Sequence, residues 1–249
     1  MKSFSSIVIT GASSGIGEAL ALDYAAPGVA LALTGRDGGR LDAVAAACRA
    51  KGATVVAETV DVVDRERLAA WLAAFDEAHP VDLLIANAGI SIDKDNSSLD
   101  EFSVIRKTFD VNVGGVLNTV EPLLPRLIAR RRGQIAVVAS LASFIGLPYS
   151  ASYNASKAAV RVWGESIRYV LKKSDIGVSV ICPGFVVSRM TANAPFPMPF
   201  LMTSARASSI IRRGLERNCA RIAFPIGTKA AVWFGQALPG RWTARLLGA

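Results

Sequence analysis

The sequence predicts an α/β fold in which one doubly wound parallel sheet of about seven strands carries helices on both faces. Short, β-branched apolar runs alternate with longer helical patterns, which is typical of βαβ units. The runs are continuous in apolar residues, as in strands buried on both faces. The 249 residues, 51% of them hydrophobic, are enough for one domain with a large core. We therefore expect a single domain over residues 1–249.

Seven runs are expected to form the strands, at residues 6–10, 29–34, 54–60, 81–86, 134–139, 178–182 and 221–224. Helices are expected between them, at residues 18–26, 41–50, 65–78, 99–113, 116–132, 150–172 and 204–218. Gly114 and Gly115 predict a weak point between two of these helices. Because parallel strands end at one edge of a sheet, the residues directly after the strands are expected to line a common crevice.

The first strand runs directly into a glycine-rich turn, residues 11–17. Glycines let the backbone approach a phosphate closely, and the N–H groups and dipole of the following helix favour an anion. The spacing Gly-x3-Gly-x-Gly differs from the commoner G-x-G-x-x-G, and many glycine-rich turns bind nothing. Its place between a first strand and a first helix predicts a dinucleotide site. The expected ligand groups are Gly11, Ser13, Ser14, Gly15, Ile16 and Gly17.

The second strand is followed by Gly35, Arg36 and Asp37. An acid at this place holds a ribose 2′-hydroxyl, whereas an arginine accommodates a 2′-phosphate. Arg36 therefore predicts NADP as the cofactor, in preference to NAD. The alternatives are that Arg36 is a solvated loop residue and that Asp37 binds the ribose.

Polar residues end or interrupt other apolar runs. Asp61 and the Asn87-Ala88-Gly89 segment stand at strand ends, where the crevice is expected. Asn112 lies between Val111 and Val113, and a buried asparagine needs hydrogen-bond partners. A functional role and a purely structural bridge are equally compatible with Asn112.

A general acid/base is suggested by Tyr153 and Lys157, four residues apart in a predicted helix. At this spacing the ammonium and the phenol share one helix face, and a nearby cation lowers the pKa of a tyrosine. Tyr169 and Lys173 have the same spacing, so the spacing alone does not distinguish the two pairs.

Composition excludes several classes of site. With His79 as the single histidine, a histidine metal cluster and a Ser-His-Asp triad are excluded, and no metal site is expected. Three cysteines without paired spacing argue against a disulfide framework. No signal peptide and no apolar stretch of bilayer length is evident, so we expect a cytoplasmic protein. The net charge of +8 comes without a recognition motif, so no nucleic-acid partner is expected.

Two segments near the C-terminus suggest contacts of their own. Residues 189–203 contain prolines, phenylalanines and methionines, and we expect a lid over a lipophilic substrate, with a packed loop as the alternative. Residues 228–249 combine aromatic, apolar and basic side chains. This composition fits peripheral contact with an anionic membrane, and packing on the domain or on a partner subunit is the alternative.

Taken together, the motifs resemble the short-chain dehydrogenase/reductase family. The matching residues, in order along residues 5–190, are Thr10-Gly11-x3-Gly15-Ile16-Gly17, Asp61, Asn87-Ala88-Gly89, Asn112, Ser140, Tyr153-x3-Lys157 and Pro183-Gly184. Each motif alone is weak, but seven in register are specific. Ser140 lies thirteen residues before Tyr153, at the family's usual kind of separation. Tyr169 has no such partner, so Tyr169 and Lys173 are expected to be ordinary helix surface or interface.

The resemblance implies a Rossmann-type oxidoreductase that transfers a hydride between a nicotinamide dinucleotide and an alcohol or carbonyl compound. Many NADP-using relatives carry a basic residue where this chain has Ser14, so the expectation of NADP rests on Arg36 alone. Tyr153 would exchange the proton, Lys157 would lower its pKa and hold the nicotinamide ribose, and Ser140 would orient the substrate oxygen. Asn112 would position a water that links Lys157 to solvent.

The resemblance implies further contacts with the cofactor. Asp61 and Val62 would lie at the adenine. The adjacent ribose and the sheet edge would be met by Asn87, Ala88 and Gly89. Near the carboxamide and phosphate, the expected residues are Pro183, Gly184, Val186 and Ser188. The family also suggests a homodimer or homotetramer. The alternative function is a nucleotide-binding sensor or scaffold without catalysis, which would have no reason to keep Ser140, Tyr153, Lys157 and Asn112 together.

Overall fold

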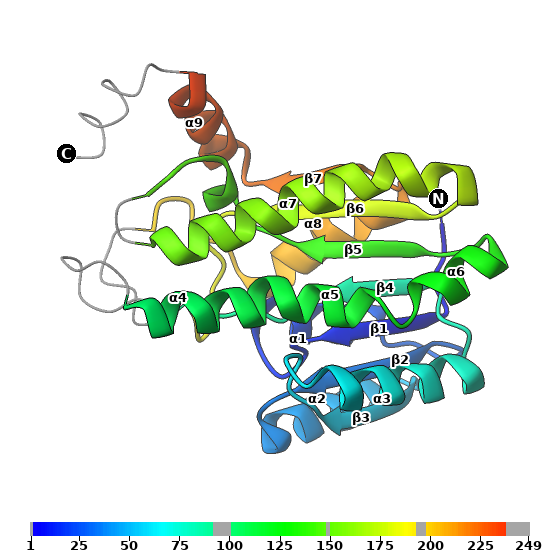
Figure 1. The fold of residues 1–249 in the computed structure, drawn as a ribbon. Helices are drawn as coiled ribbons and strands as arrows, with labels where there is room; N and C mark the ends of the chain where they lie inside the picture. Colours follow the sequence, from blue (N-terminus) through cyan, green and yellow to red (C-terminus); the bar gives the residue numbers. More distant parts are fainter. Residues whose placement is uncertain (1, 92–100, 148–149, 193–197, 238–249) are drawn as a thin grey trace.

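The predicted parallel sheet is present in the computed structural model, which describes residues 2–91, 101–147, 150–192 and 198–237 (Figure 1). Within these residues, seven strands form one all-parallel sheet in the order β3-β2-β1-β4-β5-β6-β7. The strands are β1 (Ser6–Thr10), β2 (Ala30–Gly35), β3 (Thr54–Thr59), β4 (Leu83–Ala86), β5 (Gln134–Val138), β6 (Gly177–Pro183) and β7 (Arg221–Phe224). The chain reverses its direction of winding between β3 and β4, so the carboxyl ends of β1 and β4 flank the crevice expected of this topology.

Helices cover both faces of the sheet. They are α1 (Gly15–Tyr24), α2 (Gly38–Ala50), α3 (Arg65–Ala78), α4 (Phe102–Phe109), α5 (Gly115–Val120), α6 (Leu124–Arg130), α7 (Ala151–Leu171), α8 (Ser204–Glu216) and α9 (Ile226–Ala237). Successive strand residues point to opposite faces, and this divides the core into two layers. Val8 of β1 packs in the layer under α3, α5 and α7, whereas Ile7 and Ile9 pack in the layer under α1, α2 and α8.

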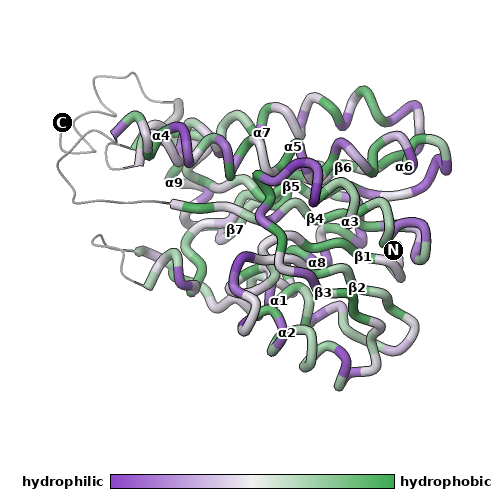
Figure 2. The backbone as a smooth tube through the Cα atoms, turned by 60° about the horizontal axis from the view of Figure 1, so that its bottom comes forward, coloured by the Kyte–Doolittle hydropathy of each residue, from purple (hydrophilic) through white to green (hydrophobic). Residues whose placement is uncertain are grey.

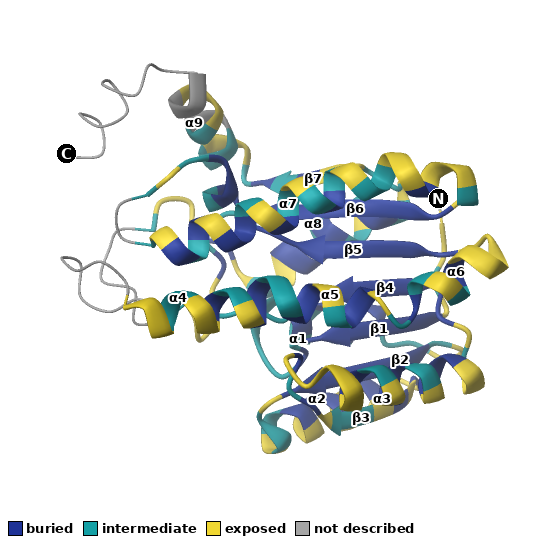
Figure 3. Ribbon diagram, viewed as in Figure 1, coloured by how far each residue is buried: buried dark blue, intermediate teal, exposed yellow. Residues whose placement is uncertain are grey.

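Burial reflects the same division. The five central strands are buried throughout, the edge strands β3 and β7 are partly exposed, and most helices show one buried and one exposed side (Figure 3). In the view of Figure 2, hydrophobic residues run along the strands while hydrophilic residues gather on the helices and turns. Continuous apolar runs therefore became central strands, as their composition predicts.

The segment between β4 and β5 differs from the expected pair of helices. Residues Asp110–Gly114 form a π-helical turn, η1, and the chain stays helical through Gly114 and Gly115 into α5. The turn comes later, at residues 121–123, just before Pro125 in the first turn of α6. Gly115 is needed for packing, because a Cβ there would lie 2.5 Å from Cγ2 of Val62.

Candidate active site at the carboxyl edge of the sheet

The glycine turn forms a tight cradle between β1 and α1. Gly11 and Gly15 have φ values of +67° and +61°, which disfavour other residues. A Cβ on Gly11 would lie 2.8 Å from Cα of Ala88, and one on Gly17 would lie 2.6 Å from Nδ2 of Asn87. Ser14 caps α1 without a side-chain hydrogen bond, so the first N–H groups of the helix are not occupied by that side chain. The cradle thus has the backbone shape that a pyrophosphate requires.

The cradle is held by Thr10 and Asn87. Nδ2 of Asn87 donates to the carbonyl oxygens of Thr10, at 2.9 Å, and of Gly11, at 3.2 Å. Oγ1 of Thr10 accepts from the backbone N–H groups of Asn87 and Ala88, at 3.1 and 3.2 Å. In this structure Asn87 therefore positions the turn, although its predicted role is at the ribose. Thr10 has no role among the predicted site residues, although it directly precedes the first glycine.

A pocket of about 410 Å³ lies just beyond the end of β2, at Arg36. Its walls are formed by Arg36, Asp61, Val63, Lys107, Asp110, Val111, Gly114 and Asn118. Arg36 is exposed and makes no hydrogen bond or ion pair with any described residue. Asp37, in contrast, caps α2: it accepts from the N–H of Arg40 at 3.0 Å and pairs with Nη2 of Arg40 at 2.7 Å. The guanidinium of Arg36, and not the carboxylate of Asp37, is therefore the group left available to a ligand.

The positions of two residues, Lys107 in the wall of this pocket and Val62 beside it, could not be predicted from motifs. Lys107 enters the wall from α4, so its position depends on how that helix packs over the sheet. Val62, predicted to meet an adenine, is buried against Gly115, and its carbonyl oxygen accepts from Nδ2 of Asn118 at 2.9 Å. Oδ1 of Asp61 accepts from the N–H of Val63 at 3.2 Å, which fixes the turn after β3.

Lys157 is the buried cation of the site. Its side chain on α7 is only 3% exposed, and Nζ donates to the carbonyl oxygen of Val138 at 2.8 Å. Nζ lies 5.8 Å from the centroid of the Tyr153 ring, one helical turn earlier. Burial lowers the pKa of Lys157 to about 8. At neutral pH the side chain is still mostly protonated, so a positive charge stands beside the phenol.

Asn112 forms a bridge between the loop after β4 and α7. Its Nδ2 donates to the carbonyl oxygen of Ile90 at 2.9 Å and to Oγ of Ser156 at 3.0 Å, and its Oδ1 accepts from the N–H of Ile90 at 2.8 Å. A Cβ on Gly89 would lie 3.1 Å from both Oδ1 of Asn112 and Nζ of Lys157. Gly89 is therefore flanked closely by the side chains of Asn112 and Lys157.

Ser140 stands after β5 and begins the short 3₁₀ turn η2 (Leu141–Phe144), which packs against α7. Its Oγ accepts from the N–H of Ala142 at 3.1 Å and makes only a long contact, 3.4 Å, to the carbonyl oxygen of Pro183. Val138, whose carbonyl oxygen binds Lys157, lies two residues before Ser140. The end of β5 therefore connects Lys157 and Ser140. The hydroxyl is half-buried and can donate to an incoming oxygen.

The loop after β6 returns to the glycine cradle. A Cβ on Gly15 would lie 3.0 Å from Cβ of Ser188, and the N–H of Ser188 is held by Oγ1 of Thr191 at 2.9 Å. Val186 is buried and forms a parallel bridge with Met202. The structure therefore brings the predicted segment from Pro183 to Ser188 to the same edge as the cradle.

The second tyrosine–lysine pair does not form a comparable site. Tyr169 is 78% exposed on α7, and Lys173 lies beyond the end of that helix, in the 3₁₀ turn η3 (Lys172–Ser174). The expectation that Tyr169 is helix surface fits this placement.

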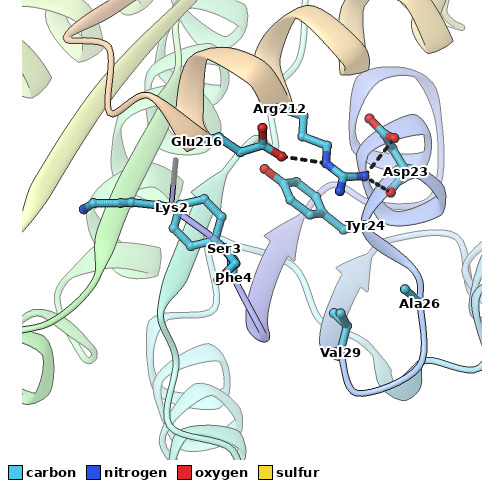
Figure 4. A pocket seen from close by; sticks show the side chains of 9 residues that line it. All are labelled: Lys2, Ser3, Phe4, Asp23, Tyr24, Ala26, Val29, Arg212 and Glu216. Carbon is cyan, nitrogen blue, oxygen red and sulfur yellow. Dashed lines mark hydrogen bonds and ion pairs between the residues drawn. The ribbon is translucent and has the colours of Figure 1, made fainter.

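A second pocket, of about 330 Å³, lies away from these residues, at the end of α1 (Figure 4). Arg212 of α8 stacks over Tyr24, with its guanidinium carbon 5.1 Å from the ring centroid, and is bound by Asp23 and Glu216. The Tyr24 hydroxyl is buried without a hydrogen-bond partner in the described structure. No predicted site residue lines this pocket.

Within the described residues, no group of three or more His, Cys, Asp or Glu side chains could hold a metal ion. In the same part of the chain, no helix is both long and apolar enough to cross a bilayer.

Comparison with known proteins agrees with this geometry. The family model described as short chain dehydrogenase matches residues 5–196. An uncharacterized oxidoreductase of Myxococcus xanthus is 37% identical over 238 residues, covering 95% of this chain and 94% of the relative. A putative oxidoreductase, SadH, of Mycobacterium tuberculosis is 36% identical over 193 residues, covering 75% and 68%.

Two solved structures extend the comparison to three dimensions. A short-chain dehydrogenase from Sphingobium yanoikuyae in complex with NADPH has a TM-score of 0.81 at 26% identity, covering 97% of this chain and 92% of that one. A short chain dehydrogenase/reductase from Burkholderia phymatum in complex with NAD has a TM-score of 0.82 at 26% identity, covering 98% and 95%. The chain therefore belongs to the short-chain dehydrogenase/reductase family of oxidoreductases.

Proposed function

We propose that the protein interconverts a hydroxyl and a carbonyl group on a lipophilic substrate, with NADP(H) as the hydride partner and Tyr153 as the general acid/base. The observation that carries this proposal is the buried ammonium of Lys157, 5.8 Å from the Tyr153 ring and tied to the strand that ends just before Ser140. Burying a cation is costly, and a catalytic role for its charge explains why the site contains one.

The proton chemistry depends on the positions of these side chains. The ammonium of Lys157 favours the phenolate of Tyr153, which makes proton exchange with a substrate oxygen feasible near neutral pH. The hydroxyl of Ser140 donates to the same oxygen and orients it. Asn112, bound to Ile90 and Ser156, holds the segment around Gly89 against α7, and we propose that a water beside it connects Lys157 to solvent.

The cradle fits a nicotinamide dinucleotide. The glycines at 11, 15 and 17 leave no room for side chains, and the capping side chain of Ser14 leaves the N–H groups at the start of α1 unoccupied. When bound, the nicotinamide supplies or accepts the hydride. The chain's own contribution is to bind and orient the reactants and to move the proton.

NADP is favoured over NAD by the pocket after β2. Arg36 has no partner there among the described residues, Lys107 adds a second cation, and Asp37 is engaged in capping α2. A 2′-phosphate could pair with Arg36 and Lys107, which stand in the pocket wall together with the carboxylates of Asp61 and Asp110. The structural relatives named above were solved with NADPH in one case and NAD in the other, so the preference proposed here rests on Arg36 and Lys107.

A lipophilic substrate is favoured by the segment proposed as a lid. In the described part of this segment, the side chains of Met190, Phe200 and Leu201 are 42%, 63% and 46% exposed. Residues 193–197 of the segment lie outside the described residues. A series of ketones with increasing apolar bulk tests the proposal, and equal turnover of small polar and bulky apolar ketones would contradict it.

The decisive experiment compares Tyr153→Phe with Tyr169→Phe. Both variants remove one hydroxyl from α7, but only the first removes the proposed acid/base. Tyr153→Phe should lose turnover by about 10²-fold or more and retain NADPH binding, measured by fluorescence titration, while Tyr169→Phe should behave as the wild type.

A panel of carbonyl compounds and alcohols, assayed with NADPH/NADP and NADH/NAD, identifies the reaction. Full activity of Tyr153→Phe would contradict the mechanism. Nucleotide binding by the wild type without turnover of any compound would instead favour a sensor or scaffold.

A further inference from the structure

An exposed apolar surface lies on α9 and on the loop that precedes α8. We call it the α9 face and define it by Ile226, Lys229, Trp233 and Phe234 of α9 together with Phe200 and Leu201 of the loop. On α9, Ile226, Trp233 and Phe234 are 82%, 44% and 67% exposed. In Figure 3 the coloured part of α9 is largely exposed or intermediate, in contrast to the buried central strands.

The residues of the α9 face belong together in space. Ile226, Lys229 and Trp233 have the spacing i, i+3, i+7, so they share one side of the helix. Nζ of Lys229 lies 4.3 Å from the Trp233 ring centroid. A Cβ on Gly227 would lie 3.0 Å from Cζ of Phe200, so the loop contacts the first turn of α9. Val232 packs against the core and so anchors α9 to the domain.

The part of the chain that carries this face contains almost no acidic residues. From residue 176 to residue 249 the sequence contains a single acid, Glu216, whose carboxylate accepts from Nε of Arg212 at 3.1 Å. Arg189 and Arg206, in the loop after β6 and at the start of α8, are exposed and form no ion pair with a described residue, and neither does Lys229. The same segments thus combine aromatic and aliphatic side chains with unneutralised cations.

We propose that the α9 face binds the surface of an anionic lipid membrane. Tryptophan and phenylalanine side chains enter the boundary between headgroups and acyl chains, and nearby lysine and arginine side chains attract anionic headgroups. A second subunit is the other candidate occupant. The scarcity of acids in these segments favours the membrane, because a copy of the chain docked through the same face would bring its own unneutralised cations close to these.

The α9 face lies at the same end of the molecule as the proposed active site. α9 stands at the end of the molecule toward which the strands point, whereas α6 lies at the opposite end (Figure 1). Ser140, just after β5, and Ser188, in the loop after β6, lie at the same end as α9. A membrane bound by the α9 face would therefore lie beside the entrance of the proposed active site. This inference does not depend on the cofactor or substrate proposed above.

The test is co-sedimentation of the full chain with two kinds of vesicle, phosphatidylcholine alone and phosphatidylcholine with about 30% phosphatidylglycerol, which supplies the anionic surface. The test variant is Trp233→Ser/Phe234→Ser, and the matched control is Ile128→Ser, which removes an exposed apolar side chain of α6 at the far end of the molecule. Circular dichroism and thermal unfolding check that each variant is folded.

The wild type and Ile128→Ser should bind the anionic vesicles and bind the neutral ones more weakly. Trp233→Ser/Phe234→Ser should lose at least about tenfold in vesicle affinity, and Lys229→Glu should lose mainly the preference for anionic lipid. Failure of the wild type to bind anionic vesicles, or wild-type binding by the double variant, would overturn the proposal. A change of the double variant to a smaller oligomer in light scattering, without an effect on vesicle binding, would assign the face to a subunit contact instead. Activity in solution is measured separately, so a failure here leaves the proposed reaction untouched.

Discussion

The buried ammonium of Lys157 makes the stability of the protein depend on pH in a defined direction. Its pKa is about 8 in the folded protein and 10.5 when the side chain is free in solution. Between these values the unfolded chain binds more protons at this site, so stability rises with pH. Below pH 8 both states are protonated, and burial of the charge costs about 3 kcal/mol.

This cost should be visible in Lys157→Met. Relative to that variant, the free energy of unfolding of the wild type should increase as pH rises from about 8 to 10.5, by up to about 3 kcal/mol. Urea denaturation of the protein without cofactor, at several pH values, measures the difference. Lys173→Met, at an exposed site, should show no such trend. A pH-independent difference between wild type and Lys157→Met would contradict the proposed burial of the charge.

Tyr24 presents the opposite case, a polar group whose burial serves no evident chemistry. Its hydroxyl has no hydrogen-bond partner among the described residues, and burial raises its pKa. Tyr24→Phe keeps the ring under Arg212 and removes the unsatisfied hydroxyl, so the free energy of unfolding should stay the same or rise by about 1 kcal/mol. Chemical denaturation measures the change, with the exposed Tyr169→Phe as the control. A loss of more than about 1 kcal/mol would reveal a partner for the hydroxyl.

At the scale of elements, η2 is fixed by a pair of cations around one ring. Guanidinium carbons of Arg161 and Arg221 lie 4.3 and 5.1 Å from the ring centroid of Phe144, and both arginines pair with Glu165. Arg161 and Glu165 belong to α7, and Arg221 belongs to β7. The turn that begins at Ser140 is therefore tied to the helix that carries Tyr153.

Replacing Phe144 should affect catalysis more than a comparable core change elsewhere. Phe144→Leu should destabilise the protein by about 1–3 kcal/mol and lower kcat, because Ser140 is no longer held in place, while NADPH affinity is retained. Phe75→Leu in α3 is the matched control, since Phe75 is similarly buried but far along the chain from the site. Equal kcat values in the two variants would show that the contact serves stability alone.

Elements with a clear sequence pattern were predicted to the residue. β1, α3 and β7 begin and end as their apolar runs indicate, because the period of each run matches the element and no competing signal is present. The parallel pairing of all seven strands also agrees with the alternation of strands and helices along the sequence.

The path between β4 and β5 could not be predicted in the same way. Gly114 and Gly115 indicate a break by propensity, but the chain stays helical through both, and at Gly115 the helix passes too close to Val62 of another segment for a side chain to fit. The contacts of Asn112 and the place of Lys107 likewise depend on how η1 and α4 pack. The catalytic candidates carry sequence signals because their spacing is local, whereas the side chains that support them come from distant elements.

At the scale of the whole molecule, bound nucleotide should act as a stabilising ligand that spans several elements. A ligand at about 100 times its Kd stabilises the folded state by about 2.7 kcal/mol. In thermal unfolding, NADP should raise Tm at lower concentration than NAD. Arg36→Ala and Lys107→Ala should each reduce the shift with NADP and leave the shift with NAD.

The control for this experiment is Arg65→Ala, a surface arginine paired with Glu121 outside the pocket walls. It should respond to both nucleotides as the wild type does. A larger shift with NAD than with NADP in the wild type would contradict the proposed cofactor preference, without affecting the assignment to the family.

The π-helical turn at Asp110–Gly114 has a consequence for how the chain tolerates changes in length. A π turn contains one residue more than the α turn it replaces, so η1 is equivalent to a single-residue insertion in an otherwise continuous helix. Deleting one residue from this segment would remove the bulge and leave α4 and α5 in their present register, whereas a one-residue deletion elsewhere in the helix would rotate its two halves by about 100° relative to each other. The deletion in η1 would instead disturb the local geometry that lets Asn112 reach Ile90 and Ser156 together. The bulge therefore marks the place where this helix can shorten by one residue without turning the helices on either side of it.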